Sequence, residues 1–366
     1  MKSWKTRGAF LRAPHKIELV SDLDVELLVN GRSDVVIVEM GACGVCGSDV
    51  NYWNGINPWS LHTKGTNDPI PPNAILGHEI AGTIVDVRRA TSPDREGERV
   101  GVIAYKECGE CVDCLNGRHN LCAHCLHLGH DGTWEGWQVV PGGFADYFPC
   151  WHEKCVPIPD HLSFAEASQL DGLAVATHAN NRVGVTLGDA VLVIGAGPIG
   201  YMATQVAKAK GADKVVVVDV ADNPLARVDK VGADVTVNSS REDIVDVVLR
   251  ETGGLGADRV IDTIGSAETV KAGLRSLKRS GTLGMLAGFA EEVTLHLSSL
   301  AAERTVTSCA NNAFPEYLQA LNMLAAGKVD VKSMITHTFP LDEIEQAILV
   351  ASDHEEHDSL KVVVVP

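Results

Sequence analysis

The sequence of 366 residues lacks any long apolar run. No stretch approaches the roughly 20 apolar residues that a membrane-spanning helix needs. The N-terminal segment MKSWKTRGAFLRAPHK is basic, but no apolar run follows it, so it does not have the pattern of a secretory signal. We therefore expect a cytoplasmic protein with no membrane partner. In that reducing compartment its ten cysteines would be metal ligands or free thiols.

Positive charge is also scarce. Lysine and arginine number 31 against 48 aspartates and glutamates, which gives a formal net charge of −17. Such a surface repels phosphate backbones, so we expect no nucleic acid partner. Hydrophobic residues make up 45% of the chain, enough to fill real cores, and the length predicts about two domains.

Four cysteines stand close together in the run CGECVDCLNGRHNLC. Thiolates at this spacing can surround one Zn²⁺ tetrahedrally and leave no open position, which is the form of a structural zinc site. The sequence therefore predicts a structural zinc lobe at about residues 105–125. Its ligands would be Cys108, Cys111, Cys114 and Cys122.

The pattern of the chain changes near Ala190. Up to about residue 160, many Gly and Pro residues and short β-type runs predict an irregular antiparallel domain. Beyond Ala190, helical stretches alternate with apolar runs at residues 191–194, 215–219, 259–262 and 282–287. Such runs indicate a parallel sheet covered by helices on both faces. This alternation fades after about residue 310, and residues 361–366 predict a strand that returns to the first domain.

A G-x-G-x-x-G loop joins the first apolar run to a predicted helix over residues 198–210. Gly195 would allow a tight turn, Gly197 a close approach to a pyrophosphate, and Gly200 close packing of helix and strand. Pro198 and Ile199 would open the helix, whose free N–H groups would face the phosphates. This arrangement indicates a dinucleotide-binding site.

Asp219 ends the next apolar run, 19 residues after Gly200. An acid at this spacing accepts hydrogen bonds from the adenosine ribose and repels a 2′-phosphate. The following residues, 220–223, contain no arginine to offset that repulsion. The sequence therefore predicts NAD as the cofactor in preference to NADP.

Two further motifs stand upstream, GVCGSD at residues 44–49 and GHEIAG at residues 77–82. With the cysteine cluster and the G-x-G-x-x-G loop, they make the whole chain resemble the zinc-dependent medium-chain alcohol and polyol dehydrogenases. The resemblance is closest to the sorbitol-dehydrogenase-like branch, through the segments GVCGSDVNYW and VTLGDAVLVIGAGPIG. It implies an α/β protein with a GroES-like distorted β-barrel and a doubly wound parallel Rossmann sheet. We expect the catalytic domain at 1–172, the NAD-binding domain at 173–308 and a return to the catalytic domain at 309–366.

The same resemblance implies a second, catalytic zinc. Cys46 and His78 match two of its ligands, and the third would be Asp171 or Glu79, which the sequence cannot separate. Asp49 matches a carboxylate that orients a ligating imidazole. A zinc ion with an open position lowers the pKa of a bound alcohol, which can then give hydride to the nicotinamide. Ser48 matches the hydroxyl that relays the proton of the alcohol.

The chain also departs from this family pattern. Asn51 stands where many members have the histidine at the outer end of the proton relay, and water or His62 would have to replace it. His62 lies in a segment, residues 54–73, that reads as a long loop. Gly47 stands where some members have an arginine for the pyrophosphate, a contact that the resemblance assigns to Lys361 instead.

A further group of possible ligands follows the cysteine cluster and comprises His124, Cys125, His127 and His130. We interpret this group as part of a solvated loop, not as a metal site. Tyr52, in the segment after Cys46, could line the substrate pocket or belong to the core.

The sequence thus predicts an enzyme that transfers a hydride from a secondary alcohol to NAD and holds two zinc ions per chain. The resemblance favours a polyol, sugar or cyclitol as substrate and a ketone as product. L-Threonine and simple secondary alcohols are the alternatives, and a non-catalytic NAD-binding zinc protein is the alternative from another class. Relatives are dimers or tetramers, so we expect a homo-oligomer, preferably a tetramer.

Overall fold

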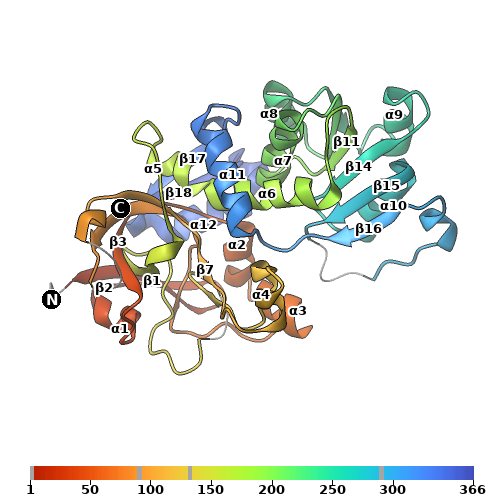
Figure 1. The fold of residues 1–366 in the computed structure, drawn as a ribbon. Helices are drawn as coiled ribbons and strands as arrows, with labels where there is room; N and C mark the ends of the chain where they lie inside the picture. Colours follow the sequence, from red (N-terminus) through yellow and green to blue (C-terminus); the bar gives the residue numbers. More distant parts are fainter. Residues whose placement is uncertain (1–3, 89–92, 131–133, 288–291) are drawn as a thin grey trace. The chain divides into compact units, whose positions relative to one another are not determined.

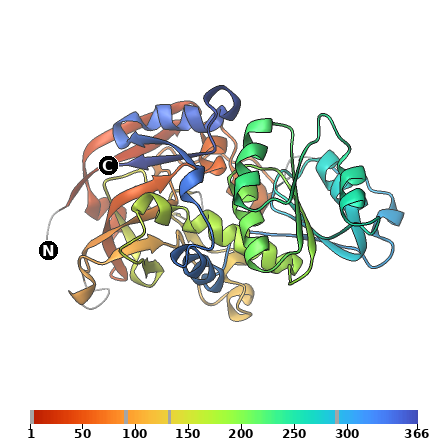
Figure 2. The same ribbon diagram turned by 90° about the horizontal axis from the view of Figure 1, so that it is seen from above.

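The computed structural model describes residues 4–88, 93–130, 134–287 and 292–366, with all their side chains except those of residues 62–64. Internal contacts divide the chain into two compact units (Figures 1 and 2). The first unit comprises residues 1–171 and 335–366, and the second comprises residues 172–334.

The first unit is built mainly from antiparallel strands, as the sequence predicts. Its large sheet has the strand order β10-β6-β5-β3-β18-β17, with β9 also paired to β3, and smaller sheets have the orders β2-β1-β4 and β7-β8. The strands are β1 (Lys5–Ala13), β2 (Lys16–Asp24), β3 (Val35–Gly44), β4 (Ala74–Ile75), β5 (Glu79–Asp86), β6 (Arg99–Val102), β7 (Tyr105–Lys106), β8 (Leu126–His127), β9 (Tyr147–Trp151), β10 (Cys155–Pro157), β17 (Ile335–Pro340) and β18 (Lys361–Val365). Its helices are α1 (Val25–Val29), α2 (Gly47–Trp53), α3 (Pro58–Lys64), α4 (Val112–Leu115), α5 (Phe164–Ser168), α12 (Ile344–Ser352) and α13 (His354–His357).

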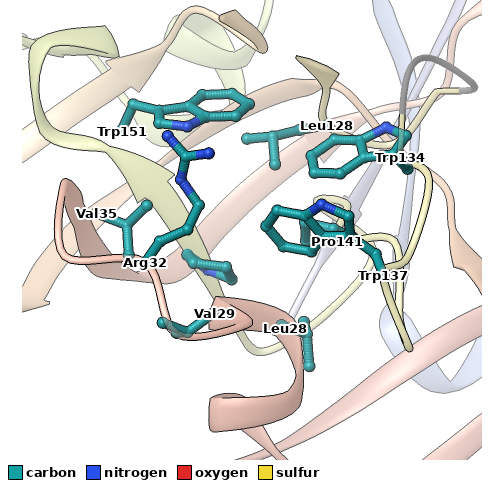
Figure 3. Close-up of a pocket in the computed structure, with 10 residues that line it drawn as sticks. Leu28, Val29, Arg32, Val35, Leu128, Trp134, Trp137, Pro141 and Trp151 are labelled. Atoms are coloured by element: carbon teal, nitrogen blue, oxygen red, sulfur yellow. The ribbon is translucent and has the colours of Figure 1, made fainter.

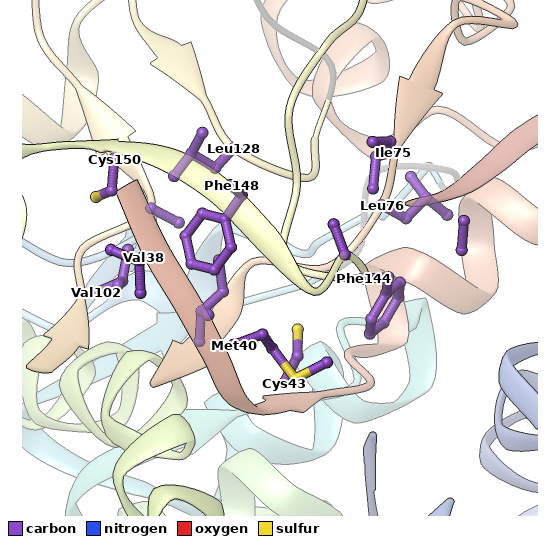
Figure 4. Packing of buried hydrophobic residues seen from close by; sticks show 14 of the residues in the cluster. Val38, Met40, Cys43, Ile75, Leu76, Val102, Leu128, Phe144, Phe148 and Cys150 are labelled. Carbon is purple, nitrogen blue, oxygen red and sulfur yellow. The ribbon is translucent and has the colours of Figure 1, made fainter. Parts of the chain in front are cut away.

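The core of this unit lies between its sheets. Val38 and Met40 from β3 pack with Phe148 and Cys150 from β9, and Phe144 continues the cluster (Figure 4). All five side chains are at most 1% exposed. Burial of side chains of this size stabilises a fold by about 1.5–3 kcal/mol each, which fixes the strands that carry the site described below.

The register of the central strands brings distant segments of the chain together. Gly44, at the end of β3, pairs with Glu79 on β5 and with Val363 on β18. The segments that begin at Cys46, at Gly77 and at Lys361 therefore meet at one edge of the large sheet. The C-terminal strand β18 thus lies beside β3 of the first unit.

The second unit is a parallel sheet with helices on both faces, as predicted. Its strand order is β13-β12-β11-β14-β15-β16, and every pair along it is parallel. Helices α7 and α8 pack together, as do α9 and α10. The strands are β11 (Ala190–Ile194), β12 (Lys214–Asp219), β13 (Val235–Asn238), β14 (Ala257–Asp262), β15 (Leu277–Met285) and β16 (Thr305–Ser308). The helices are α6 (Leu170–Val183), which begins at the unit boundary, α7 (Pro198–Ala209), α8 (Asp222–Val228), α9 (Ile244–Glu251), α10 (Ala267–Ser276) and α11 (Phe314–Ala325).

The second boundary differs from the expected one. Residues 309–334 belong to the second unit, and the return begins only at Ile335. Helix α11 holds this segment there, because Glu316 contacts His178 of α6 at 3.4 Å and Gln319 accepts a hydrogen bond from Asn181. The loss of the strand–helix alternation near residue 310 therefore marks the end of the sheet, not the end of the domain.

The expected long loop at residues 54–73 is also interrupted by a helix, α3. Asn57 caps it by accepting a hydrogen bond from the backbone N–H of Ser60 at 2.9 Å, and Pro58 occupies its first turn. An asparagine before a proline is a recognised helix-start signal, which the reading of this segment as a loop overlooked. The backbone of His62 lies in α3, but its side chain is outside the described part, so its expected role in the relay stays a prediction. No helix among the described residues is long and apolar enough to cross a membrane.

Candidate active site and cofactor-binding loop

The four clustered cysteines converge as the sequence predicts. Their Sγ atoms are 3.9 Å apart for Cys108 and Cys114, 3.5 Å for Cys111 and Cys114, and 4.0 Å for Cys111 and Cys122. A zinc–sulfur bond of about 2.3 Å in a tetrahedron places neighbouring sulfurs about 3.8 Å apart. These separations fit one zinc ion and are far too long for disulfides, whose sulfurs lie about 2 Å apart.

Backbone N–H groups of this lobe also donate hydrogen bonds to the cysteine sulfurs. The N–H of Cys111 donates to Cys108 Sγ at 3.4 Å, and the N–H of Cys108 donates to Cys122 Sγ at 3.3 Å. A backbone hydrogen bond from Cys114 lowers the pKa of Cys111 to about 7, whereas burial raises the pKa of Cys114 to about 12. Four thiols this close cannot all ionise unless a positive ion joins them.

A second group of possible ligands forms in the first unit. One ligand atom each from Cys46, His78 and Glu79 lies within 4.8 Å of the other two. Cys46 stands between β3 and α2, and Glu79 opens β5 directly after His78. Thiolate, imidazole and carboxylate together are a donor set that zinc favours, and three protein ligands leave a fourth position open. Cys46 is partly exposed, whereas His78 and Glu79 are buried.

Asp49 ties the two ligand-bearing segments together. Its Oδ2 accepts the backbone N–H of Cys46 at 2.9 Å, and its Oδ1 accepts the backbone N–H of Gly77 at 3.3 Å. The same Oδ1 lies 3.8 Å from His78 Nδ1, a buried atom with no hydrogen-bond partner among the described residues. Since Nδ1 faces Asp49, Nε2 is the nitrogen left for a metal. This is the arrangement in which a second carboxylate sets the orientation and tautomer of a ligand.

The charges around His78 are unbalanced without a cation. Burial disfavours its protonated form, but Asp49 and Cys46 outweigh burial and raise the pKa of His78 to about 10. Burial raises the pKa of Asp49. A site that raises the pKa of an imidazole this far attracts positive charge, and a divalent metal ion would satisfy it in place of the proton.

Within the first unit, Lys361 contacts Glu79. Its side chain is 4% exposed, and its ammonium forms an ion pair with Glu79 and donates to the backbone carbonyl of Val45 at 3.0 Å. Burial opposes its charge, but Glu79 outweighs that effect and raises the pKa of Lys361. The expected contact of Lys361 with the cofactor pyrophosphate stays a prediction. Gly44 is required beside the pair, because a Cβ there would lie 2.1 Å from Glu79 Oε2.

Asp171, Ser48 and Asn51 are also expected near the metal, and the structure places each of them differently. Asp171 is near enough to His78 to raise its pKa, but it is outside the group of ligand atoms that lie within 4.8 Å of one another. Ser48 Oγ lies 3.4 Å from His78 Nε2 and is partly exposed, as a relay hydroxyl must be. Asn51 is exposed on α2. Of the two candidates for the third ligand, the geometry favours Glu79.

His127 and His130 face this site, although the sequence led us to expect them in a solvated loop. The rings of His127 and His130 lie 5.7 and 5.1 Å from that of His78, and 4.8 Å from each other. Tyr52, 1% exposed, shares a hydrogen bond of 2.7 Å with His130 Nδ1 and so belongs to both the core and the site. Burial lowers the pKa of His127 to about 3 and that of His130 well below its usual value. No spacing in the sequence signals this cluster, because it forms only when β8 and α2 pack near His78.

A separate crevice in the first unit is not a candidate site. Trp134, Trp137 and Trp151 line it together with Arg32 and Leu128 (Figure 3). Its cavity volume is about 10 Å³, enough for about one water molecule. The crevice is a packing gap among aromatic rings.

In the second unit, the glycine loop has the geometry that a dinucleotide requires. Gly195 has a φ of +96°, and a Cβ on Gly200 would lie 1.8 Å from the carbonyl oxygen of Gly195. A Cβ on Gly197 would meet nothing within 4 Å, so open space faces the backbone there. Helix α7 starts at Pro198 and Ile199, and no side chain caps it, which leaves its first N–H groups for an anion. The residues present therefore fit a bound pyrophosphate.

Asp219 is the last residue of β12, and its carboxylate also holds the glycine loop by hydrogen bonds. Its Oδ2 accepts the N–H of Ala196 at 2.8 Å, and its Oδ1 accepts the N–H of Ala221 at 3.0 Å. Each carboxylate oxygen has two lone pairs, so the group can still accept ribose hydroxyls. Its expected role toward the ribose stays a prediction.

Comparison with known proteins agrees with both units. Residues 32–160 match the alcohol dehydrogenase GroES-like domain, and residues 198–326 match the zinc-binding dehydrogenase family. The chain belongs to the zinc-dependent medium-chain dehydrogenases. Its fold is therefore the expected α/β combination of a GroES-like domain and a Rossmann-like sheet.

Individual relatives extend over most of the chain. The sorbitol dehydrogenase of Bombyx mori is 31% identical over 87% of this chain and 89% of its own length. The L-threonine 3-dehydrogenase of Bacillus velezensis is 30% identical over 85% and 86%. The crystal structure of ECK1772 from Escherichia coli, an oxidoreductase/dehydrogenase of unknown specificity, superposes with a TM-score of 0.87 at 28% identity and covers 99% of both chains.

Membership in this family confirms the prediction of an enzyme that uses zinc and a nicotinamide cofactor. The alternative of a non-catalytic NAD-binding zinc protein is therefore wrong. The relatives act on different alcohols by their names, so they support a polyol or alcohol dehydrogenase in general and leave the substrate open.

Proposed function

We propose that this medium-chain dehydrogenase oxidises a secondary alcohol group of a polyol, sugar or cyclitol to a ketone, with NAD as hydride acceptor. The observation that carries the proposal is the convergence of Cys46, His78 and Glu79 beside the Ser48 hydroxyl. We further propose that this group holds the catalytic zinc and that Cys108, Cys111, Cys114 and Cys122 hold the structural one, so that each chain binds two zinc ions.

The residues of the first unit have distinct tasks in this proposal. Cys46 Sγ, His78 Nε2 and the Glu79 carboxylate would hold the metal, and Asp49 keeps the imidazole turned toward it. When bound, Zn²⁺ supplies the Lewis acidity that lowers the pKa of an alcohol. Ser48 Oγ would accept the proton of the substrate hydroxyl and pass it on.

The residues of the second unit hold the cofactor. The backbone N–H groups at the start of α7 would bind the pyrophosphate, and Gly197 leaves it room. When bound, NAD supplies the acceptor for hydride. Asp219 supports NAD over NADP, since its carboxylate at the end of β12 would repel a 2′-phosphate. Equal kcat/KM values with the two cofactors would contradict this preference.

A polyol is favoured over L-threonine by charge. An amino acid carboxylate needs a cationic partner, and Lys361, the lysine at this site, is buried against Glu79. Sugars, polyols and cyclitols are uncharged and need no such partner.

The proposal is tested by NADH absorbance with a panel of sorbitol, xylitol, myo-inositol, L-threonine and 2-butanol. We expect turnover with at least one polyol or cyclitol, and we expect Cys46→Ser to abolish it while NADH binding persists. Turnover with L-threonine alone, or full activity of Cys46→Ser, would overturn the proposal. We also propose a homo-oligomer, preferably a tetramer, which sedimentation analysis would check.

A further inference from the structure

The histidine cluster near the metal ligands is larger than the proposed reaction requires. His127 on β8 and His130 just beyond it face His78, at ring separations of 5.7 and 5.1 Å. All three belong to the first unit. His78 accounts for metal binding, and Ser48 accounts for the proton, so His127 and His130 have no task in the reaction as described.

Their hydrogen bonds leave one nitrogen of each ring available. His127 Nδ1 lies 3.1 Å from the carbonyl oxygen of Leu128, which can only accept, so Nδ1 carries the proton and Nε2 has a free lone pair. His130 Nδ1 is engaged by the Tyr52 hydroxyl at 2.7 Å. In the part of the chain that the structure describes, neither Nε2 atom has a hydrogen-bond partner. Both residues are partly exposed.

A second metal ion does not account for the two rings. Among the described residues, the ligand atoms that gather closely enough for a metal are those of the four cysteines and those of Cys46, His78 and Glu79. The nitrogens of His127 and His130 belong to neither group.

A hydroxyl group is the ligand that fits two neutral imidazoles. When the Tyr52 hydroxyl donates to His130 Nδ1, His130 Nε2 carries the proton of the ring, and a substrate hydroxyl can then donate to His127 Nε2 and accept from His130 Nε2. The two rings stand directly beside the ring of a metal ligand. A substrate whose reacting oxygen lies at the metal ligands would therefore bring a hydroxyl on the adjacent carbon to these nitrogens.

We propose that His127 and His130 bind the hydroxyl group next to the reacting one, so that the enzyme selects vicinal diols over isolated secondary alcohols. The inference rests on the proposed function and names the residues that would recognise its substrates. Tyr52 is a positioning residue in this scheme, because its hydroxyl sets the orientation of the His130 ring. A site built to hydrogen-bond a substrate hydroxyl discriminates strongly against an analogue that lacks it, because its polar groups are then left unpaired.

The test compares pairs of alcohols that differ by one adjacent hydroxyl, 2,3-butanediol with 2-butanol and trans-1,2-cyclohexanediol with cyclohexanol. For the wild type we expect kcat/KM to be higher for each diol than for its partner. His127→Leu and His130→Leu should each lower this ratio about tenfold, which corresponds to the loss of roughly one hydrogen bond. Tyr52→Phe should lower it less, and His130→Gln should restore part of it. The matched control is His124→Leu, an exposed histidine of the same segment, which should leave the ratio unchanged.

Two measurements besides turnover complete the test. Zinc analysis should give the wild-type content for both leucine variants, and calorimetry should show weaker binding of 2,3-butanediol to their NADH complexes. An unchanged diol ratio in both variants, or a loss of zinc from them, would overturn this inference while the dehydrogenase activity stands. If the wild type oxidises none of the four alcohols and no polyol, the proposed function itself fails, and this inference fails with it.

Discussion

Asp49→Asn tests how the fold holds the catalytic metal. The carboxylate accepts one backbone N–H on each oxygen, from Cys46 on Oδ2 and from Gly77 on Oδ1. An asparagine has one acceptor oxygen, so in either orientation its NH₂ group faces a backbone donor. One hydrogen bond to a charged group is lost at a fully buried position, which should cost about 1.5–3 kcal/mol of folding free energy.

The same change should weaken zinc binding. The negative charge that faces His78 Nδ1 at 3.8 Å disappears, and with it the group that orients the ring. Loss of such a carboxylate typically lowers metal affinity about 10–100-fold, or about 1.4–2.7 kcal/mol. Competition with a chromophoric chelator measures the zinc affinity, and urea unfolding measures the stability.

A chemically identical change elsewhere provides the control. Asp243 caps α9 and accepts the N–H groups of Val245 and Asp246, at 2.8 and 3.2 Å, on the single oxygen Oδ1. Asp243→Asn can keep both bonds and should change neither stability nor zinc affinity appreciably. If Asp49→Asn unfolds more easily but binds zinc as tightly as the wild type, Asp49 is only a helix cap, and its assigned role toward His78 is refuted.

Three other predictions concern the remaining parts of the account. Glu79→Gln should lower the affinity of the catalytic site for zinc more than Asp171→Asn does, as the same chelator titration would show, and the reverse order would make Asp171 the third ligand. Cys114→Ser should reduce the zinc content from two ions per chain to one and lower Tm by about 5 °C or more, as metal analysis and calorimetry would show. Gly200→Ala should destabilise the second unit, because its Cβ would lie 1.8 Å from a backbone carbonyl, whereas Gly197→Ala should fold normally and lose NADH affinity in a fluorescence titration.

The parts of the structure that follow from short segments were predictable from the sequence. The zinc lobe is one example, because its four cysteines lie between residues 108 and 122 and need only a local turn to converge. The loop at Gly195 is another, since its glycines, the strand before it and the helix after it are contiguous.

Contacts between distant segments were not predictable in the same way. Lys361 reaches Glu79 only because β18 and β5 both pair with β3, and no local pattern encodes that register. His127 and His130 looked like members of a polar loop because their partners, His78 and Tyr52, come from other elements. Residues 309–334 stay with the second unit through contacts of α11 with α6, which the periodicity of the sequence does not reveal.

Anomalous diffraction at the zinc edge, from crystals grown without added metal, tests the central claim most directly. The account predicts two peaks per chain, one within bonding distance of the four clustered cysteines and one within bonding distance of Cys46, His78 and Glu79. A single peak at the cysteine cluster, with no metal beside Cys46 even after soaking in zinc, would contradict the proposed active site.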